Sequence, residues 1–400
     1  MKLNPEYIVF DGNMFERLLG LLEDVRLPSN LPVIDMSIGE PKQPPAKILR
    51  DSVIRNNDNW QYYPKAAGNS RFVSTIHEYI ARRWPEAAGI VCSDHIIPVP
   101  GTREPLHLLG NLVRGSKSNP LALITNPFYH AWRAGGVASG ARIKFLNCTV
   151  ENNFLPELDS LKSNDLENAT VLYLCNPTNP QGSVMELGYL KKILRLAREN
   201  DFLLIMDECY SDIWRGSPPI GALQAVASLE KESKNTVSLD LLSNLVVLNS
   251  LSKRSGAAGL RAGFMVGDKT VIKQYSKLVA NGGSLVPTPL LEVAADLYSD
   301  DSHVEAIRSY YDNNFRLVEQ HLGIGPPPGG FFLWLKVDDD LTFTRRLMAE
   351  QGVRVLPGSF MGVEAEGTNP GSGYVRLALV NDSSTTNEGL LRVAKVYKSQ

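Results

Sequence analysis

Five short stretches of the chain are continuously apolar, unlike the alternating pattern of a sheet with one solvent-exposed face. They cover residues 95–100, 120–127, 169–177, 202–208 and 244–250. Continuous apolar runs of this length are typical of parallel strands that are covered on both faces. We therefore predict that these stretches form buried strands of one sheet.

Patterns of helical period lie between these runs, most clearly at 103–113, 186–200 and 221–229. Alternation of strands and helices indicates βαβ units, and therefore an α/β fold with a parallel sheet. In such sheets, ligands bind at the carboxyl ends of the strands. A polar, turn-forming sequence follows each of the five runs, so we expect a ligand site at that edge of the sheet.

The pattern changes after about residue 285. Residues 284–298 and 303–322 have the pattern of long helices, whereas 326–337 and 373–380 have the pattern of apolar strands. This succession predicts a smaller α+β domain over 285–400.

The N-terminal part of the chain contains one further amphipathic helix, at 14–25, which has no evident partner in the α/β part. We therefore expect residues 1–35 to form an N-terminal arm and part of the smaller domain. This leaves 36–284 as the large domain.

Composition places the chain among ordinary globular proteins. Of its 400 residues, 43% are hydrophobic and 21% are charged, and the formal net charge is −2. Binding to nucleic acid or to an anionic membrane surface requires a basic footprint, so neither partner is expected. Glu6, Asp11 and Glu16 interrupt the N-terminal segment, and no window has the roughly 18–20 uncharged apolar residues of a membrane span.

The four cysteines, Cys92, Cys148, Cys175 and Cys209, are far apart and form no Cys-x-x-Cys pair. This spacing argues against a disulfide scaffold and a structural zinc site, and the six histidines show no metal-ligand spacing either. We expect no metal, a reducing cytoplasmic setting, and cysteines that behave as ordinary core residues.

The polar sequence after the fifth run contains Lys253. A lysine at a strand end is ordinarily solvated. Its amine becomes nucleophilic when burial or neighbouring cations lower its pKa, and Arg254 and Arg261 are candidate neighbours. Ser250, Ser252 and Arg261 are residue types that bind phosphate. The segment therefore combines a candidate Schiff-base lysine with a candidate phosphate site.

Three motifs follow one another along the chain: Asn-Pro-x-Gly at 179–182, Asp-x-x-Tyr at 207–210 and Ser-Leu-Ser-Lys-x-x-Gly-x-x-Gly-x-Arg at 250–261. In this order and at this spacing they resemble the class I/II aminotransferases of fold type I, which use pyridoxal phosphate. The resemblance extends from about residue 34 to residue 380. It implies a large domain with a central, mostly parallel sheet flanked by helices, and a smaller α+β domain.

The resemblance also implies roles for individual residues. Lys253 would hold pyridoxal phosphate through a Schiff base and then move the proton in catalysis. Asp207 would pair with the pyridine nitrogen and keep the ring an electron sink. Tyr210 and Asn179 would donate hydrogen bonds to the phenolic oxygen of the ring, and Tyr129 would stack on its face.

The phosphate of the cofactor is expected at the start of the helix after the first run. Backbone N–H groups and the helix dipole meet an anion there. The residues expected to contact the phosphate are Gly101, Thr102, Arg103, Ser250, Ser252 and Arg261.

For the substrate, the resemblance implies that Arg376 binds the α-carboxylate, because a planar guanidinium can contact a carboxylate with two parallel hydrogen bonds. Gly39 matches the segment that lines the substrate entrance, and Asn179 is also expected to contact substrate. Tyr63 matches a tyrosine that reaches the phosphate in the neighbouring subunit, and Tyr62 is the alternative. This implies a homodimer with sites at its interface.

Within the family, the chain most resembles the bacterial N-succinyl-diaminopimelate aminotransferases of lysine biosynthesis. Five segments carry this resemblance, at 34–45, 126–132, 207–214, 249–264 and 356–362. The implied reaction is a ping-pong exchange between glutamate and N-succinyl-2-amino-6-ketopimelate. Both substrates are anionic small molecules, so basic groups are expected at the mouth of the site, with Arg103, Arg133 and Arg254 as candidates.

Alternatives remain open at this point. N-acetylornithine or a broad range of amino acids are other possible substrates of an aminotransferase. A carbon–sulfur lyase or decarboxylase on the same fold would use the same lysine, aspartate and arginine. A ligand-binding regulator on this fold would normally carry a basic DNA-binding region, which this sequence does not show.

Overall fold

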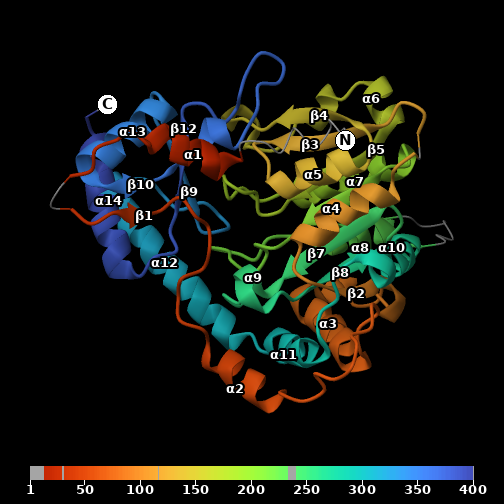
Figure 1. Ribbon diagram of the computed structural model, residues 1–400. Helices are drawn as coiled ribbons and strands as arrows, with labels where there is room; N and C mark the ends of the chain where they lie inside the picture. The colour runs from red at the N-terminus through yellow and green to blue at the C-terminus, as the bar shows by residue number, and fades with distance from the viewer. Residues whose placement is uncertain (1–12, 29–30, 116, 233–239, 400) are drawn as a thin grey trace, which may run out of the picture.

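The computed structural model describes residues 13–28, 31–115, 117–232 and 240–399. Within these ranges, seven strands form one large sheet, which lies in the right half of Figure 1. Their spatial order is β2 (Ile96–Val99), β8 (Gly263–Gly267), β7 (Leu245–Ser250), β6 (Leu203–Asp207), β5 (Ala169–Cys175), β3 (Leu121–Asn126) and β4 (Arg142–Asn147).

The sheet is mostly parallel, as predicted. The five apolar runs form β2, β3, β5, β6 and β7, and every residue of these strands is buried. The pattern missed β4, an edge strand with an exposed Arg142, and the glycine-flanked β8. β8 runs antiparallel to both of its neighbours, so its first residue lies at the edge where the other strands end.

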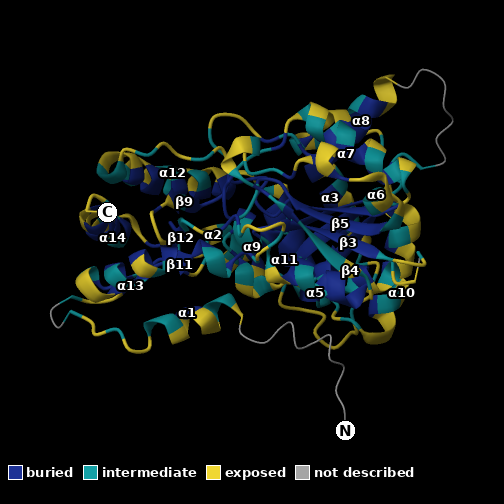
Figure 2. Cartoon of the chain, turned by 90° about the horizontal axis from the view of Figure 1, so that it is seen from above, coloured by how far each residue is buried: buried dark blue, intermediate teal, exposed yellow. Residues whose placement is uncertain are grey.

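Helices cover both faces of this sheet, and Figure 2 shows its buried strands between two helical layers. One layer contains α3 (Ser70–Arg83), α7 (Leu187–Glu199) and α8 (Ala222–Glu232), and its apolar side chains share one core cluster. The other contains α4 (Arg103–Leu112), α5 (His130–Ala138) and α10 (Lys269–Gly282). Two covered faces explain why the strands read as continuous apolar runs.

The spacing of apolar residues and the capping residues at the helix ends explain why these segments are helical. In α7, the buried residues are Leu190, Ile193, Leu194 and Ala197, which recur at the spacing of one helix face. Asp268 begins α10 because its carboxylate accepts hydrogen bonds from the backbone N–H groups of Thr270 and Val271. The remaining helices of this part of the chain are α6 (Ser163–Asn168), the one-turn α9 (Leu251–Arg254), α11 (Thr288–Ser299) and α2 (Lys47–Arg55), and α2 packs against α11.

A second, smaller group of elements lies at the left of Figure 1. Its three-stranded sheet has the order β11 (Leu356–Pro357), β12 (Tyr374–Ala378) and β9 (Phe332–Lys336). Its other elements are α1 (Met14–Leu22), β1 (Ile34–Asp35), α12 (Ser302–Leu322), α13 (Asp340–Gln351), β10 (Val353–Arg354) and α14 (Ser383–Tyr397).

The two ends of the chain meet in this smaller group. β1 pairs in parallel with β10, and α1 packs against α13 and β11. Residues 1–12 of the predicted N-terminal arm lie outside the described residues, and the predicted domain limits stay a prediction. Across the described ranges, no helix combines the length and apolar character that crossing a membrane requires.

Candidate active site

A cavity of about 360 Å³ opens between the large sheet and the smaller group of elements. It lies at the carboxyl ends of the sheet strands, the edge that the sequence predicted. Most of the predicted site residues line it: Gly39, Thr102, Arg103, Tyr129, Asn179, Asp207, Tyr210, Ser250, Ser252, Lys253, Arg261 and Arg376.

Strand register explains why residues so far apart in sequence meet. Cys175 of β5 pairs with Asp207 of β6, and Asp207 pairs with Leu248 of β7, so the motifs that follow these strands share one edge. Gly263 at the start of β8 pairs with both Val99 and Ser250. The single antiparallel strand thus enters the sheet at the cavity and brings Arg261 with it.

Lys253 lies in the cavity on α9, directly after β7. Ser250 caps this turn, because its hydroxyl accepts a hydrogen bond from the backbone N–H of Ser252. The Lys253 Nζ donates to the Gly39 carbonyl oxygen at 2.7 Å. Burial lowers the pKa of Lys253 to about 8, and the charge of Arg376 contributes in the same direction. The neighbours expected from sequence, Arg254 and Arg261, are not the charges that lower it.

Asp207 is the last residue of β6 and is 5% exposed. Its Oδ1 accepts from the backbone N–H of Cys209 at 3.3 Å, and it forms no ion pair with any described residue. Burial raises the pKa of this carboxyl, while its hydrogen bonds to Cys209 lower it. A buried carboxylate that lacks a cationic partner is costly, so this position suits a ligand that brings a positive charge.

Arg376 of β12 faces Lys253 from the smaller group of elements and is 4% exposed. Its Nη2 donates to the Ser37 carbonyl oxygen at 3.0 Å and its Nη1 donates to Asn179 Oδ1 at 3.3 Å. The Nε is buried without a hydrogen-bond partner, and no described carboxylate pairs with the guanidinium. Burial lowers the pKa of Arg376 to about 10. The guanidinium is therefore a buried cation that still has N–H donors free for a ligand.

Tyr210 closes the cavity on the side of the smaller group. Its ring packs edge-on against Phe331 and Phe332, with centroids 5.5 and 6.0 Å apart. Burial raises the pKa of the phenol well above its ordinary value, so the hydroxyl keeps its proton and can donate it in a hydrogen bond.

The opposite end of the cavity is built to receive an anion. No side chain caps the N-terminus of α4, which begins at Arg103, so its first backbone N–H groups need another acceptor. Gly101 has a φ of +76°, and a Cβ there would collide with the Arg261 guanidinium. Arg261 donates to the Pro100 carbonyl oxygen at 2.7 Å, which holds it beside this loop.

Tyr129 precedes α5, and its hydroxyl accepts a hydrogen bond from Arg103 Nε at 3.1 Å. Its ring lies 4.3 Å from the ring of His130, which also lines the cavity. Burial, reinforced by the charge of Arg103, lowers the pKa of His130 to about 4. The imidazole is therefore neutral at physiological pH.

Sequence reasoning missed several residues of the cavity wall: Met14, Phe15, Ile38, Glu40, Trp132, Ala258 and Phe332. Met14 and Phe15 arrive from α1, a helix whose sequence pattern indicates only an apolar face. Phe332 packs where a Cβ on Gly39 would lie, which explains the glycine at that position. Ile38 and Glu40 flank Gly39, so the motif around Gly39 could have identified both as residues of the cavity wall.

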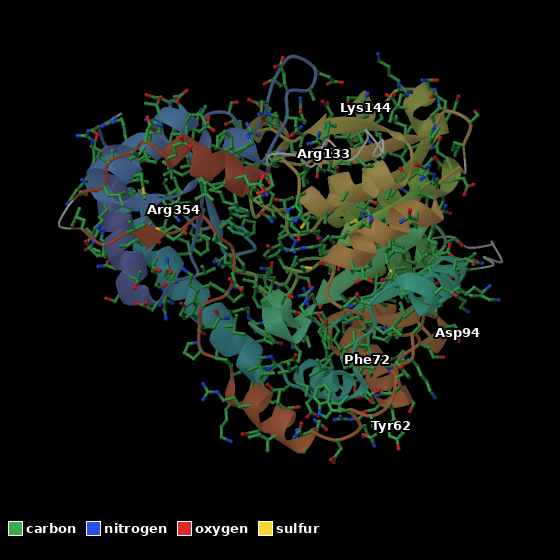
Figure 3. All side chains as sticks on the ribbon, viewed as in Figure 1. Tyr62, Phe72, Asp94, Arg133, Lys144 and Arg354 are labelled. Carbon is green, nitrogen blue, oxygen red and sulfur yellow. The ribbon has the colours of Figure 1, made fainter. Side chains whose placement is uncertain are left out.

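Some expected residues lie elsewhere. Arg133 and Arg254 were candidates for the mouth of the site, but neither lines the cavity. Arg254 points into the protein interior, and Arg133 lies 5.9 Å from the ring of Phe128. Tyr63 is 98% exposed and does not line the cavity of its own chain, and Figure 3 shows Tyr62 at the molecular surface. Cys92 is exposed, contrary to the expectation of a core cysteine.

The donor set fits pyridoxal phosphate. It contains a buried amine for the carbonyl carbon, a buried carboxylate without a cation for the ring nitrogen, and an uncapped helix start with two serines and an arginine for the phosphate. Among the described residues, no group of three or more metal-ligating side chains is placed to hold a metal ion.

Comparison with known proteins agrees with this geometry. Residues 32–393 match the sequence model of the family described as aminotransferase class I and II. A probable aminotransferase of Mycobacterium tuberculosis is 26% identical over 87% of this chain and 77% of its own length. The LL-diaminopimelate aminotransferase of Aquifex aeolicus is 26% identical over 94% of this chain and 93% of its own.

Solved structures show the same relationship. An aminotransferase of Neisseria meningitidis is 31% identical, covers 97% of this chain and 98% of its own, and superimposes with a TM-score of 0.89. The aminotransferase AspB of Helicobacter pylori is 29% identical over the full length of both chains, with a TM-score of 0.88. This chain therefore belongs to the class I and II aminotransferases and is a transaminase that depends on pyridoxal phosphate.

Proposed function

We propose that this transaminase exchanges an amino group between glutamate and N-succinyl-2-amino-6-ketopimelate, in the diaminopimelate route to lysine. The observation that carries the proposal is Arg376, a buried guanidinium with no carboxylate partner in the described chain, placed across the cavity from Lys253. Both substrates have an α-carboxylate, which would complete the hydrogen bonds of this arginine.

Bound pyridoxal phosphate supplies an electron sink that stabilises negative charge at the substrate α-carbon. Thr102, Arg103, Ser250, Ser252 and Arg261 would hold its phosphate. Backbone N–H groups at the start of α4 would contribute as well.

The chain's own residues then divide the remaining work. The carboxylate of Asp207 would hold a proton at the ring nitrogen, because a buried negative charge favours the protonated ring. Tyr210 and Asn179 would donate hydrogen bonds to the phenolic oxygen of the ring, and Tyr129 would cover the ring face. With a pKa of about 8, the Lys253 amine is available in its neutral form close to physiological pH, so it accepts the proton from the substrate α-carbon.

LL-diaminopimelate is a second candidate substrate. Several relatives at 25–26% identity carry the name LL-diaminopimelate aminotransferase. Glu40 also lines the cavity, and its charge acts on Lys253. A carboxylate there would attract the distal ammonium group of free diaminopimelate, whereas the succinylated compound replaces that ammonium group by an amide.

A panel of amino donors with 2-oxoglutarate as acceptor tests the proposal. The proposal predicts the highest kcat/KM for N-succinyl-diaminopimelate, above LL-diaminopimelate and N-acetylornithine. Preference for LL-diaminopimelate that falls in Glu40→Gln would transfer the assignment to the second candidate. Ammonia and pyruvate formed without paired glutamate would indicate a lyase instead.

We also propose that the working unit is a homodimer. Exposed apolar side chains are concentrated on α2 and the segment that follows it: Val53, Ile54, Trp60, Tyr62 and Tyr63. Such a concentration is typical of a surface that another chain covers. Sedimentation analysis should give a dimer, and Tyr63→Phe, unlike Tyr62→Phe, should weaken cofactor binding if Tyr63 reaches the phosphate of the partner.

A further inference from the structure

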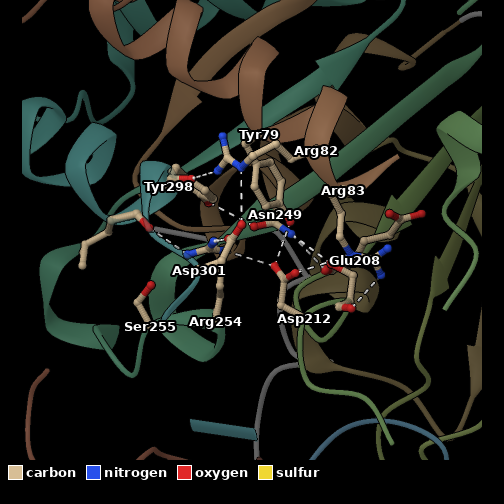
Figure 4. A network of polar contacts seen from close by, with 12 residues as sticks. Tyr79, Arg82, Arg83, Glu208, Asp212, Asn249, Arg254, Ser255, Tyr298 and Asp301 are labelled. Carbon is tan, nitrogen blue, oxygen red and sulfur yellow. Dashed lines mark hydrogen bonds and ion pairs between the residues drawn. The ribbon is translucent and has the colours of Figure 1, made fainter. Parts of the chain in front are cut away.

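A cluster of buried polar side chains includes Arg254, the residue after Lys253, and Figure 4 shows its contacts from close by. We call it the rear network. Its members are Tyr79, Asp212, Asn249, Arg254 and Tyr298, and each is at most 5% exposed. None of them lines the cavity.

The centre of the rear network is the buried ion pair of Arg254 with Asp212. Arg254 Nε lies 3.2 Å from Asp212 Oδ2, and Arg254 Nη2 lies 2.5 Å from Asp301 Oδ1. Asp212 Oδ2 also accepts a hydrogen bond from the Tyr79 hydroxyl at 2.7 Å. Asp212 Oδ1 also lies 3.5 Å from Arg83 Nε, so the loss of Arg254 leaves Asp212 with this cation but removes its ion pair with the segment that carries Lys253.

Further contacts fix the direction of the Arg254 guanidinium. It lies 5.2 Å from the ring centre of Tyr79 and 5.4 Å from that of Tyr298. Its Nη1 donates to the Leu297 carbonyl oxygen at 2.8 Å. The two aromatic rings and the backbone acceptor together restrict the orientation of this side chain.

The rear network connects the two strand ends that carry the proposed cofactor residues. Arg254 directly follows Lys253, whereas Asp212 lies two positions after Tyr210. A second link runs beside the first, because Asn249 Nδ2 donates to the Glu208 carbonyl oxygen and to Ser211 Oγ, each at 3.2 Å. The Tyr298 hydroxyl in turn donates to Asn249 Oδ1 at 3.0 Å.

α9 needs such external support. It has four residues, and a single turn is not stable on its own. Successive side chains of a helix project about 100° apart, since one turn contains 3.6 residues. The direction in which Arg254 is held therefore sets the direction in which Lys253 projects.

We propose that Arg254, through its ion pair with Asp212, is a positioning residue that aims Lys253 into the cavity and holds α9 in register with the Asp207–Tyr210 segment. It touches neither the cavity nor the bound groups, and it acts through the backbone. The inference rests on the proposed role of Lys253.

The experiment compares Arg254→Met with Arg392→Met in the cofactor-loaded enzyme. Arg392 on α14 is a matched control, because its buried side chain pairs with Glu388 at 2.7 Å and donates to the Pro32 and Gln351 carbonyl oxygens. Both variants are expected to lower the Tm. Only Arg254→Met is expected to lower kcat/KM, by about 10- to 100-fold, because a displaced catalytic group costs rate steeply.

A spectroscopic readout separates positioning from general damage. The pH midpoint of the visible absorption band of the bound cofactor reports the surroundings of Lys253 directly. We expect this midpoint to move by about half a unit or more in Arg254→Met, by less in Tyr79→Phe, and not at all in Arg392→Met. Tyr79→Phe removes only the hydrogen bond to Asp212, so it replaces Arg254→Met if that protein does not fold.

The inference would be overturned if Arg254→Met left both kcat/KM and the pH midpoint unchanged. If Arg254→Met does not fold, an unchanged pH midpoint in Tyr79→Phe would overturn it. The role of Lys253 is tested apart from this, by Lys253→Ala. A Lys253→Ala protein that still attaches the cofactor covalently would refute that role, whereas the Arg254 comparison can fail with the role intact.

Discussion

Replacing Arg376 by lysine keeps a positive charge in the cavity but removes the planar fork. In the native chain the guanidinium donates to Ser37 and Asn179 and keeps Nε without a partner. A guanidinium has five N–H donors, so enough remain for two parallel bonds to a substrate carboxylate. A lysine ammonium is a point charge and cannot reproduce that geometry.

The size of the effect follows from the number of bonds lost. Losing one hydrogen bond to a charged group costs about 1.5–3 kcal/mol. Since about 1.4 kcal/mol corresponds to a factor of ten, kcat/KM for glutamate should fall by about 10- to 150-fold in Arg376→Lys. The α-carboxylate is bound both before and during the reaction, so much of this loss should be an increase in KM.

Steady-state kinetics with glutamate and a keto-acid acceptor measure the loss. Stabilisation of the folded protein by 2-oxoglutarate, followed as a rise in Tm, gives a second readout that does not depend on turnover. Arg133→Lys is the control, because this arginine lies outside the cavity wall. A kcat/KM for Arg376→Lys within about twofold of the native value would refute the assignment of this residue to the carboxylate.

Three further predictions follow from buried groups near the cavity. Asp207→Asn should reduce turnover by about 100-fold or more, because a charged partner of the ring is lost. The cofactor-free form of this variant should be no less stable than the native one in thermal melts, because a buried charge has been removed. Gly101→Ala should weaken cofactor affinity in a titration, since its φ is +76° and its Cβ would displace Arg261; Gly259→Ala, where no heavy atom lies within 4 Å, should not. Burial raises the pKa of Glu208 from 4.5 to about 7, so its native carboxyl binds more protons than the unfolded one in this range. The free energy of unfolding of the native protein, relative to that of Glu208→Gln, should therefore fall as pH rises from about 4.5 to 7. Denaturation curves that give the same difference between the two proteins at both pH values would contradict this.

The sequence predicted the part of the site that depends on strand ends. Asp207 lies at the end of one continuously apolar run and Lys253 follows another, and neighbouring parallel strands must end at one edge. Local pattern was sufficient there because burial on both faces leaves a clear signal.

The direction in which each side chain points could not be predicted from the sequence. Arg254 and Arg261 are seven positions apart in one polar segment and have the same chemistry, yet one enters a buried ion pair and the other lies at the cavity. The outcome depends on Asp212 and on the antiparallel entry of β8, which are tertiary features. Met14 was missed for the same reason, since an apolar helix face does not reveal what it covers.

The position of covalent cofactor attachment tests the account most directly. The protein would be reduced with borohydride, digested and examined by mass spectrometry for a peptide with the added mass of reduced pyridoxal phosphate. The account predicts that the label lies on Lys253, the lysine that burial and Arg376 keep readily deprotonated. A label on any other lysine, with Lys253 unmodified, would contradict it.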